Sequence, residues 1–411
     1  MIDDPPARLD GPAYDPWDPA FIADPYPALA RLREGPPATY DERTNQWLVA
    51  RHADVNALLR DRRLGRSYLH LASHEEWGRT APPADQAPFW DLLADQMIDM
   101  EPPNHTRLRR LVTKAFTPRT VEALRPRIEA IVDEAIDRAL ALGELDLIAD
   151  LIELVPVTVI AELLGIPEGD RHLLRPWSAD MTLMFELNPT PEAQRRATDA
   201  SAAFEAHLRG LTRERRAAPR ADLISDLTAV LESGGDRLTE DELIGTAVLL
   251  LNAGHEASVN GAANSWWALL RHPESLRRLR TDPALVPTAI EELLRFDTPA
   301  PMFERWVLED IEVGGVTIPR GQELALQFAA ANRDPAVFAD ADAIVLDRSP
   351  NPYLSFGAGI HYCLGAPLAK LEFEILFGRM LGRMPRLELI EEPRWKPRFI
   401  LRGLEALRVQ V

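Results

Sequence analysis

The chain has 411 residues, a formal net charge of −18 at pH 7, 46% apolar residues and 27% charged residues. This composition is typical of a globular protein with a large core, and the acidic balance argues against a nucleic-acid binder, which needs a basic surface. No stretch reaches the ~18 consecutive apolar residues of a membrane span, and the acidic, proline-rich start lacks the pattern of a signal peptide. We therefore expect a cytoplasmic protein, and a single cysteine, Cys363, excludes an intramolecular disulfide.

The N-terminal part, about residues 1–65, combines a short helical pattern with β signals. We expect a helix near residues 26–33 and strands at 38–40 and 46–50. Residues 66–97 form a long, weakly periodic stretch that reads as a loop. Long loops in compact domains are often functional.

Helical periodicity then dominates residues 104–270, with interruptions mainly at prolines. Thr239 followed by Glu242 has the spacing of a capping box and predicts the start of a long helix that runs to Leu270. Such a helix would be roughly 45 Å long. Its apolar middle, residues 247–254, predicts that this part is buried.

β-branched residues return after Arg305, where hydrophobic residues flank Gly314–Gly315 and predict a small sheet with a tight turn. Residues 364–384 read as a helix, and residues 398–411 read as a closing hairpin. We expect one domain over residues 1–411, mainly α with a small β part. Its β-containing regions are about 1–65, 305–325 and 385–411.

The strongest local signal is residues 356–365, Phe-Gly-Ala-Gly-Ile-His-Tyr-Cys-Leu-Gly. Gly357 and Gly359 permit a tight turn with unusual backbone angles. A thiol just before a helix start faces backbone N–H groups and the positive dipole end, which lower its pKa. A thiolate is a good ligand for a transition metal. A cysteine alone is more often a buried small hydrophobic residue, so at this point both interpretations of Cys363 are open.

The whole segment resembles the haem-binding signature of the cytochrome P-450 family, Phe-x-x-Gly-x-His-x-Cys-x-Gly. Every fixed position is matched, by Phe356, Gly359, His361, Cys363 and Gly365. The resemblance implies the cytochrome P-450 fold, with a long central helix crossing over a buried haem b. It also implies that Cys363 is the axial thiolate ligand of the haem iron.

Further segments resemble the family and cover most of the chain. Glu292 and Arg295 match its Glu-x-x-Arg motif, and Arg348 matches an arginine that joins this pair. Residues three apart on a helix can pair, and we interpret these three as structural. The resemblance also implies a set of haem-propionate ligands, since buried carboxylates need cationic or hydrogen-bonding partners: His105, Arg109, Arg305 and His361.

Residues 253–258, Ala-Gly-His-Glu-Ala-Ser, resemble the family's oxygen-binding motif on the long helix. The resemblance implies that Gly254 leaves space for oxygen and that Glu256 relays protons. Ala257 replaces the usual threonine, and Ser258 is turned by about 100° from that position. Three explanations stay open: a substrate hydroxyl with ordered water delivers the proton, Ser258 reaches through a distorted helix, or the reaction is not ordinary hydroxylation. We favour the first.

By resemblance, the substrate pocket draws on several apolar segments, which predicts an apolar organic substrate of modest size. The expected lining residues are Phe89, Trp90, Met97, Met181, Met184, Phe185, Leu250, Ala253, Pro301, Met302, Phe303, Phe399 and Ile400. Each of these would be a core residue in most proteins.

No Gly-x-Gly-x-x-Gly run indicates a dinucleotide-binding domain, so electrons must come from outside, and we expect a ferredoxin with its reductase. A basic face could steer an acidic partner, although it could equally be an ordinary solvated surface. Its candidate residues are Arg107, Arg110, Lys114, Arg119 and Lys370.

The sequence thus favours a haem-thiolate monooxygenase that acts on an apolar small molecule. An enzyme for oxidative coupling, desaturation or peroxide chemistry on the same scaffold is the alternative. A non-enzymatic haem sensor would need an output domain or a partner surface, and none is visible. A protein without haem would require all these motifs to be accidental.

Overall fold

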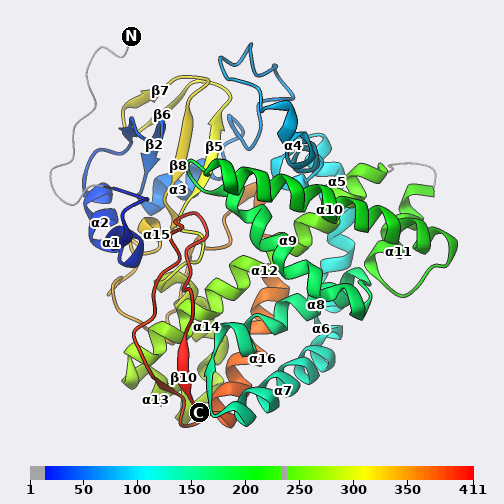
Figure 1. The fold of residues 1–411 in the computed structure, drawn as a ribbon. Helices are drawn as coiled ribbons and strands as arrows, with labels where there is room; N and C mark the ends of the chain where they lie inside the picture. Colours follow the sequence, from blue (N-terminus) through cyan, green and yellow to red (C-terminus); the bar gives the residue numbers. More distant parts are fainter. Residues whose placement is uncertain (1–13, 233–237) are drawn as a thin grey trace. The chain divides into compact units, whose positions relative to one another are not determined.

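The computed structural model describes residues 14–232 and 238–411 (Figure 1). The chain divides into two compact units that alternate along the sequence. Unit 1 comprises Met1–Gly78, Asn260–Cys363 and Met384–Val411. Unit 2 comprises Arg79–Val259 and Leu364–Arg383.

Unit 1 is built on a five-stranded sheet with the order β1-β2-β8-β5-β3. Strand β2 runs parallel to β8, and the other neighbours are antiparallel. All of β2 is buried, as expected for a strand covered on both faces. The strands are β1 (Thr39–Asp41), β2 (Gln46–Val49), β3 (Leu64–Gly65), β5 (Phe303–Val307) and β8 (Glu323–Leu326).

Short helices pack around this sheet, and α15 contacts both α2 and α3. Two small antiparallel pairs complete unit 1. Gly314 and Gly315, both with positive φ, turn β6 into β7, while β9 pairs with β10. The remaining elements of unit 1 are α1 (Pro19–Ala23), α2 (Tyr26–Glu34), α3 (His52–Leu58), α13 (Pro273–Thr281), α14 (Val286–Phe296), α15 (Phe328–Ala331), β6 (Ile311–Val313), β7 (Val316–Ile318), β9 (Glu388–Leu389) and β10 (Arg408–Gln410).

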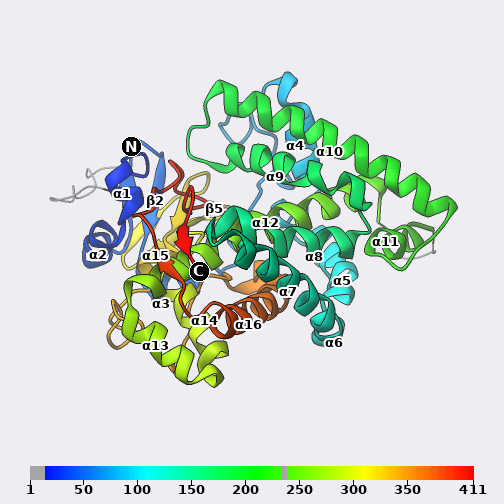
Figure 2. The ribbon, with the colours of Figure 1, turned by 60° about the horizontal axis from the view of Figure 1, so that its bottom comes forward.

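Unit 2 is mainly helical. Helix α7 lies beside α16, and the long α10 packs on α9 and α4 (Figures 1 and 2). Its elements are α4 (Ala87–Ala94), α5 (Asn104–Val112), α6 (Pro118–Ala123), α7 (Arg125–Leu142), β4 (Glu144–Asp146), α8 (Leu154–Leu164), α9 (Leu174–Met181), α10 (Pro191–Ala217), α11 (Leu223–Glu232) and α16 (Ala366–Arg383).

The long helix α12 (Glu240–Arg271) has 32 residues and belongs to both units, divided after Val259. Its start is the expected capping box: the Thr239 N–H donates to Glu242 Oε2 at 2.9 Å, and the Glu242 N–H donates to Thr239 Oγ1 at 3.0 Å. None of the helices in the described ranges has both the length and the hydropathy needed to cross a bilayer.

The fold class and most expected elements are confirmed. Two details differ. The stretch 66–97 is not a continuous loop, because α4 forms within it and buries Phe89 and Leu92. The closing hairpin begins earlier than expected, since β9 is a partner of β10 within unit 1, and Trp395 forms a further bridge with Leu404.

Candidate active site

In unit 1, Cys363 ends a loop that two glycines fold back on itself. Gly357 and Gly359 have φ of +67° and +70°, as their spacing predicts. The Cys363 N–H donates to the carbonyl of Phe356 at 2.9 Å. The Cys363 side chain is partly exposed rather than sealed in a core, which favours a functional thiol over a buried small hydrophobic residue.

Gly359 also lies very close to the end of helix α3. A Cβ atom at this position would be only 2.2 Å from the carbonyl oxygen of Leu59. Because that neighbour is backbone, it cannot rotate away as a side chain could. The cysteine loop is therefore pressed directly against the end of α3.

A buried set of hydrogen bonds around Glu292, the Glu292 cluster, supports the cysteine loop. The Glu292 carboxylate accepts hydrogen bonds from Arg295 Nε at 2.7 Å, Arg348 Nε at 2.9 Å and the Val345 N–H at 2.8 Å. Glu292 and Arg295 are fully buried. The three residues that the sequence predicts to be a structural group do come together.

Asn332 connects this cluster to the cysteine loop, and no sequence pattern predicts this role. Its carbonyl oxygen accepts from Arg295 Nη1 at 2.8 Å. Its side chain accepts from the Leu354 N–H at 2.7 Å and donates to Ser355 Oγ at 2.9 Å. These contacts fix the backbone just before Phe356.

Two expected propionate ligands lie in unit 1. Arg305, on β5, is only 4% exposed. Its guanidinium donates to the Glu304 carbonyl at 2.7 Å and lies 5.1 Å from the centre of the Phe303 ring. His361, in the short helix before Cys363, is partly exposed. A cation as buried as Arg305 favours an anionic ligand.

The other two lie in unit 2, on helix α5. His105 is buried, and Arg109 follows one turn later on the same face and is partly buried. Arg107 points elsewhere and pairs with Glu242 at 3.1 Å.

This pairing changes the basic face expected from the sequence. Arg107 is partly buried, and its charge is neutralised by Glu242. Arg110 and Arg119 are exposed, and Lys370 is partly buried. The side chain of Lys114 lies outside the described residues. Arg107 is thus a poor candidate for contact with a partner.

Helix α12 carries a stripe of small residues that the described residues, 14–232 and 238–411, leave at least partly exposed. Ala253 is exposed, and Gly254 and Ala257 are partly exposed, although the residues around them are buried. A Cβ atom at Gly254 would meet only Ile160 Cδ1, at 4.0 Å. Packing within the protein therefore does not require glycine here, and the small side chains leave space for something else.

The polar residues of segment 253–258 are buried, unlike the small residues of the stripe. Glu256 and Ser258 are buried, whereas Ala257 between them is partly exposed. Ser258 therefore does not replace the missing threonine in this helix geometry. His255 is also buried, and its Nε2 lies 3.1 Å from Glu153 Oε1, whose second oxygen pairs with Arg175 at 2.7 Å. The sequence did not single out Glu153 or Arg175.

The expected substrate residues separate into three groups. Met302 and Phe399 lie in a core cluster of unit 1, where the Tyr14 hydroxyl donates to Met302 Sδ and the Tyr14 ring packs edge-on against Phe399. Both side chains are buried in that cluster. Others keep accessible surface: Trp90, Phe185, Ala253, Phe303 and Ile400.

The remaining residues of the expected substrate lining are buried. Phe89 and Met184 belong to an apolar cluster of unit 2 that includes Trp90 and Phe185 at its edge. The other buried members are Met97, Met181, Leu250 and Pro301.

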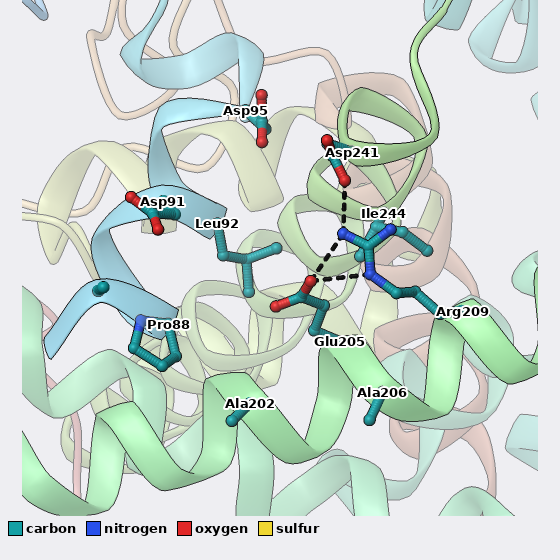
Figure 3. A pocket seen from close by; sticks show the side chains of 11 residues that line it. Pro88, Asp91, Leu92, Asp95, Ala202, Glu205, Ala206, Arg209, Asp241 and Ile244 are labelled. Carbon is teal, nitrogen blue, oxygen red and sulfur yellow. Dashed lines mark hydrogen bonds and ion pairs between the residues drawn. The ribbon is translucent and has the colours of Figure 1, made fainter. Parts of the chain in front are cut away.

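A separate hollow of about 540 Å³ lies between α4, α10 and the start of α12 (Figure 3). No residue of the expected substrate lining borders it. Arg209 pairs there with Glu205 at 2.8 Å and with Asp241 (Figure 3). Burial and the neighbouring carboxylates of Asp241, Glu242 and Asp91 raise the pKa of Asp95 to about 6.

Each unit, taken by itself, carries side chains of a kind that suits an iron porphyrin. Unit 1 supplies one accessible thiol, the buried cation of Arg305 and the imidazole of His361. Unit 2 supplies His105, Arg109 and an uncovered strip of helix with minimal side chains. One soft ligand suits iron, and two carboxylates need several cationic partners.

The similarity of this chain to known proteins is consistent with a haem-binding site. The family model for Cytochrome P450 matches residues 170–398. Cytochrome P450 107B1 of Saccharopolyspora erythraea is 40% identical over 402 residues, covering 96% of both chains. Nocardicin C N-oxygenase of Nocardia uniformis subsp. tsuyamanensis is 40% identical and covers 96% of this chain and 98% of its own.

A solved structure, P450BioI in complex with hexadec-9Z-enoic acid ligated acyl carrier protein, superposes with a TM-score of 0.89 at 35% identity. It covers 95% of this chain and 99% of that one. The cysteine loop, the buried glutamate–arginine cluster and these similarities over nearly the whole chain lead to one conclusion: the chain belongs to the cytochrome P450 family and is a haem-dependent monooxygenase.

Proposed function

We propose that the Cys363 thiolate would hold the iron of a haem b, and that His105, Arg109, Arg305 and His361 would hold its propionates. The observation that carries this proposal is the partly exposed thiol at the end of a rigidly supported two-glycine loop. A thiolate ligand pushes electron density onto haem iron, which favours O–O cleavage when oxygen is bound. Phe356, Gly359 and Gly365 shape the loop.

On the oxygen side, the uncovered stripe of Ala253, Gly254 and Ala257 provides room for oxygen and substrate. Glu256 lies beside this stripe and serves proton transfer. Because Ala257 has no hydroxyl and Ser258 is buried, we propose that a substrate hydroxyl with an ordered water completes the proton path.

An Ala257→Thr variant tests this proton path. With the native substrate, a threonine should bring no gain if the substrate already supplies the hydroxyl. Less peroxide release and more product in the variant would contradict the proposal.

The substrate is proposed to be an apolar small organic molecule of secondary metabolism, and the electron donor a ferredoxin with its reductase. The names of relatives support a broad range of oxidations, including an N-oxygenase. The cytoplasmic location stays a prediction.

Ala257 also favours a second candidate, coupling or desaturation on the same scaffold. Turnover under labelled oxygen separates the two, because only a monooxygenase transfers one labelled atom to product.

The decisive experiment is the carbon monoxide spectrum of the reduced protein beside a Cys363→Ala variant. We expect a strongly red-shifted Soret band in the parent and its loss in the variant. A band at the position of imidazole-ligated haem in the parent would mean that Cys363 does not hold the iron.

A further inference from the structure

The turn that carries Ile400 is anchored by one buried arginine. Ile400 keeps part of its surface accessible, whereas Arg402 is only 1% exposed. The Arg402 guanidinium donates to the carbonyl of Ile22 at 2.6 Å and to that of Ala23 at 2.8 Å. It also forms an ion pair with Asp297. Within unit 1, a single side chain therefore binds the turn to α1 and to the end of α14.

The main chain of the turn is bonded to a second apolar segment of unit 1. The Arg402 N–H donates to the Pro299 carbonyl at 2.9 Å. Pro299 lies four residues before Phe303, the first residue of β5, which also keeps accessible surface. This hydrogen bond joins the backbone that carries Ile400 to the backbone that leads to Phe303.

Helix α12 binds the turn through two buried asparagines that belong to the same unit. Asn264 Nδ2 donates to the Arg402 carbonyl at 3.2 Å, and Asn260 Nδ2 donates to the Leu401 carbonyl at 3.4 Å. Residues four apart lie on one face of a helix. Lys396 Nζ donates to the Asn260 oxygen at 3.4 Å. One face of α12 thus binds two consecutive carbonyls of the turn.

The Asn260 amide also packs directly against Gly403, with no room for a side chain between them. A Cβ atom at Gly403 would overlap the Asn260 amide. The backbone of Gly403 does not adopt a positive φ, so its conformation alone does not require glycine. Both residues are buried. Contact with Asn260 therefore sets how closely the turn approaches α12.

We infer that Asn260 is a positioning residue for the substrate: by spacing the turn 399–403 from α12, it determines where Ile400 presents its exposed atoms. The inference rests on the proposed haem-dependent oxidation of an apolar substrate and adds a residue that does not itself need to touch that substrate. An aliphatic side chain selects ligands by contact, and a gap of about two methylene groups weakens binding about 10-fold. Asn260 therefore controls which apolar ligands fit, and not the bond-breaking chemistry.

The test uses the haem-loaded enzyme and two probes that bind iron through an imidazole nitrogen, imidazole itself and 1-dodecylimidazole. The shift of the Soret band gives both Kd values. Gly403→Ala should displace the turn from α12 and weaken 1-dodecylimidazole about 10-fold, the loss expected for about two methylene contacts. Imidazole has no chain that could reach Ile400, so its Kd should stay at the parent value.

A second substitution provides a rescue. Asn260→Ala removes the amide that the new methyl group of Gly403→Ala would overlap. The double variant should therefore bind 1-dodecylimidazole more tightly than Gly403→Ala alone, a non-additive result. Gly378→Ala is the matched control, because Gly378 is exposed on α16 and a Cβ atom there meets nothing within 4 Å. The control should bind both probes like the parent.

Equal ratios of the two Kd values in the Gly403→Ala and Gly378→Ala proteins would overturn the inference. A double variant that binds no better than Gly403→Ala would also overturn it, because contact between these two residues would then not set the spacing. If Gly403→Ala fails to load haem, Asn260→Ala takes its place, since it removes atoms and adds none. It should show the same selective weakening of 1-dodecylimidazole, and a parent-like ratio would refute the inference.

The parent protein separates this failure from that of the proposed function. A parent whose Soret band responds to neither probe would refute the proposed haem site, and the inference with it. A parent that binds both probes, beside variants with unchanged selectivity, would refute the positioning role of Asn260 alone.

Discussion

Replacing Arg295 with lysine tests whether donor geometry, and not charge alone, supports the cysteine loop. Arg295 uses all five of its N–H hydrogens: two reach Glu292, and three reach the carbonyls of Asn332, Ala341 and Ala343. A lysine keeps the charge but has three hydrogens on one nitrogen. At least two of these five hydrogen bonds are therefore lost in a fully buried site.

The magnitude follows from the cost of unpaired buried groups. An acceptor left without its donor costs about 1–3 kcal/mol, so two such acceptors predict a loss of about 2–6 kcal/mol. The Glu292 charge is not left bare, because Arg348 still donates to it at 2.9 Å. The full cost of breaking a buried ion pair is therefore not expected.

Urea unfolding followed by far-ultraviolet circular dichroism measures this loss. The control is Arg277→Lys, whose exposed partner Glu274 is three residues away on α13. That change should cost less than about 0.5 kcal/mol. If Arg295→Lys lost less than about 1 kcal/mol, charge alone would support the loop, and the reasoning from donor geometry would be wrong.

Three further substitutions probe other features. Burial raises the pKa of Glu372 to about 8, so the folded protein keeps a proton that the unfolded chain releases from about pH 4.5 upward. Glu372→Gln should gain stability relative to the parent by about 1.4 kcal/mol per pH unit up to pH 8, and a pH-independent difference in unfolding would contradict this. Asp95→Asn should raise the melting temperature at pH 7.5 but not at pH 4, because burial and neighbouring negative charges disfavour the carboxylate. Equal changes in melting temperature at the two pH values would contradict this explanation. Gly359→Ala should lower haem content far more than Gly315→Ala, since both glycines have positive φ but only Gly359 meets backbone at 2.2 Å; similar losses would mean that strain, not contact, matters.

Local rules predicted the parts of the fold that local interactions determine. The capping box at Thr239, the turn at Gly314–Gly315 and the two-glycine loop before Cys363 each depend on neighbours within a few residues. The Glu292 cluster was predicted through a family motif, and its geometry agrees.

Long-range pairings were beyond these rules. Nothing near Asn332 in the sequence indicates that its side chain holds Leu354 and Ser355. Arg107 resembles its basic neighbours in sequence, but a glutamate 135 residues away neutralises it. Met302 and Phe399 are apolar like many other residues, and only the fold shows that they share a core cluster with Tyr14.

Glu242 links two helices through one carboxylate. It closes the start of α12 by accepting from the Thr239 N–H, and the same group binds Arg107 on α5. The helix that carries His105 and Arg109 is thereby held in register with the helix that carries Gly254 and Ala257. A slip of either helix by one turn would break the ion pair between Arg107 and Glu242. His105 and Arg109 on α5 are therefore expected to move together with Gly254 and Ala257 on α12, or not to move at all.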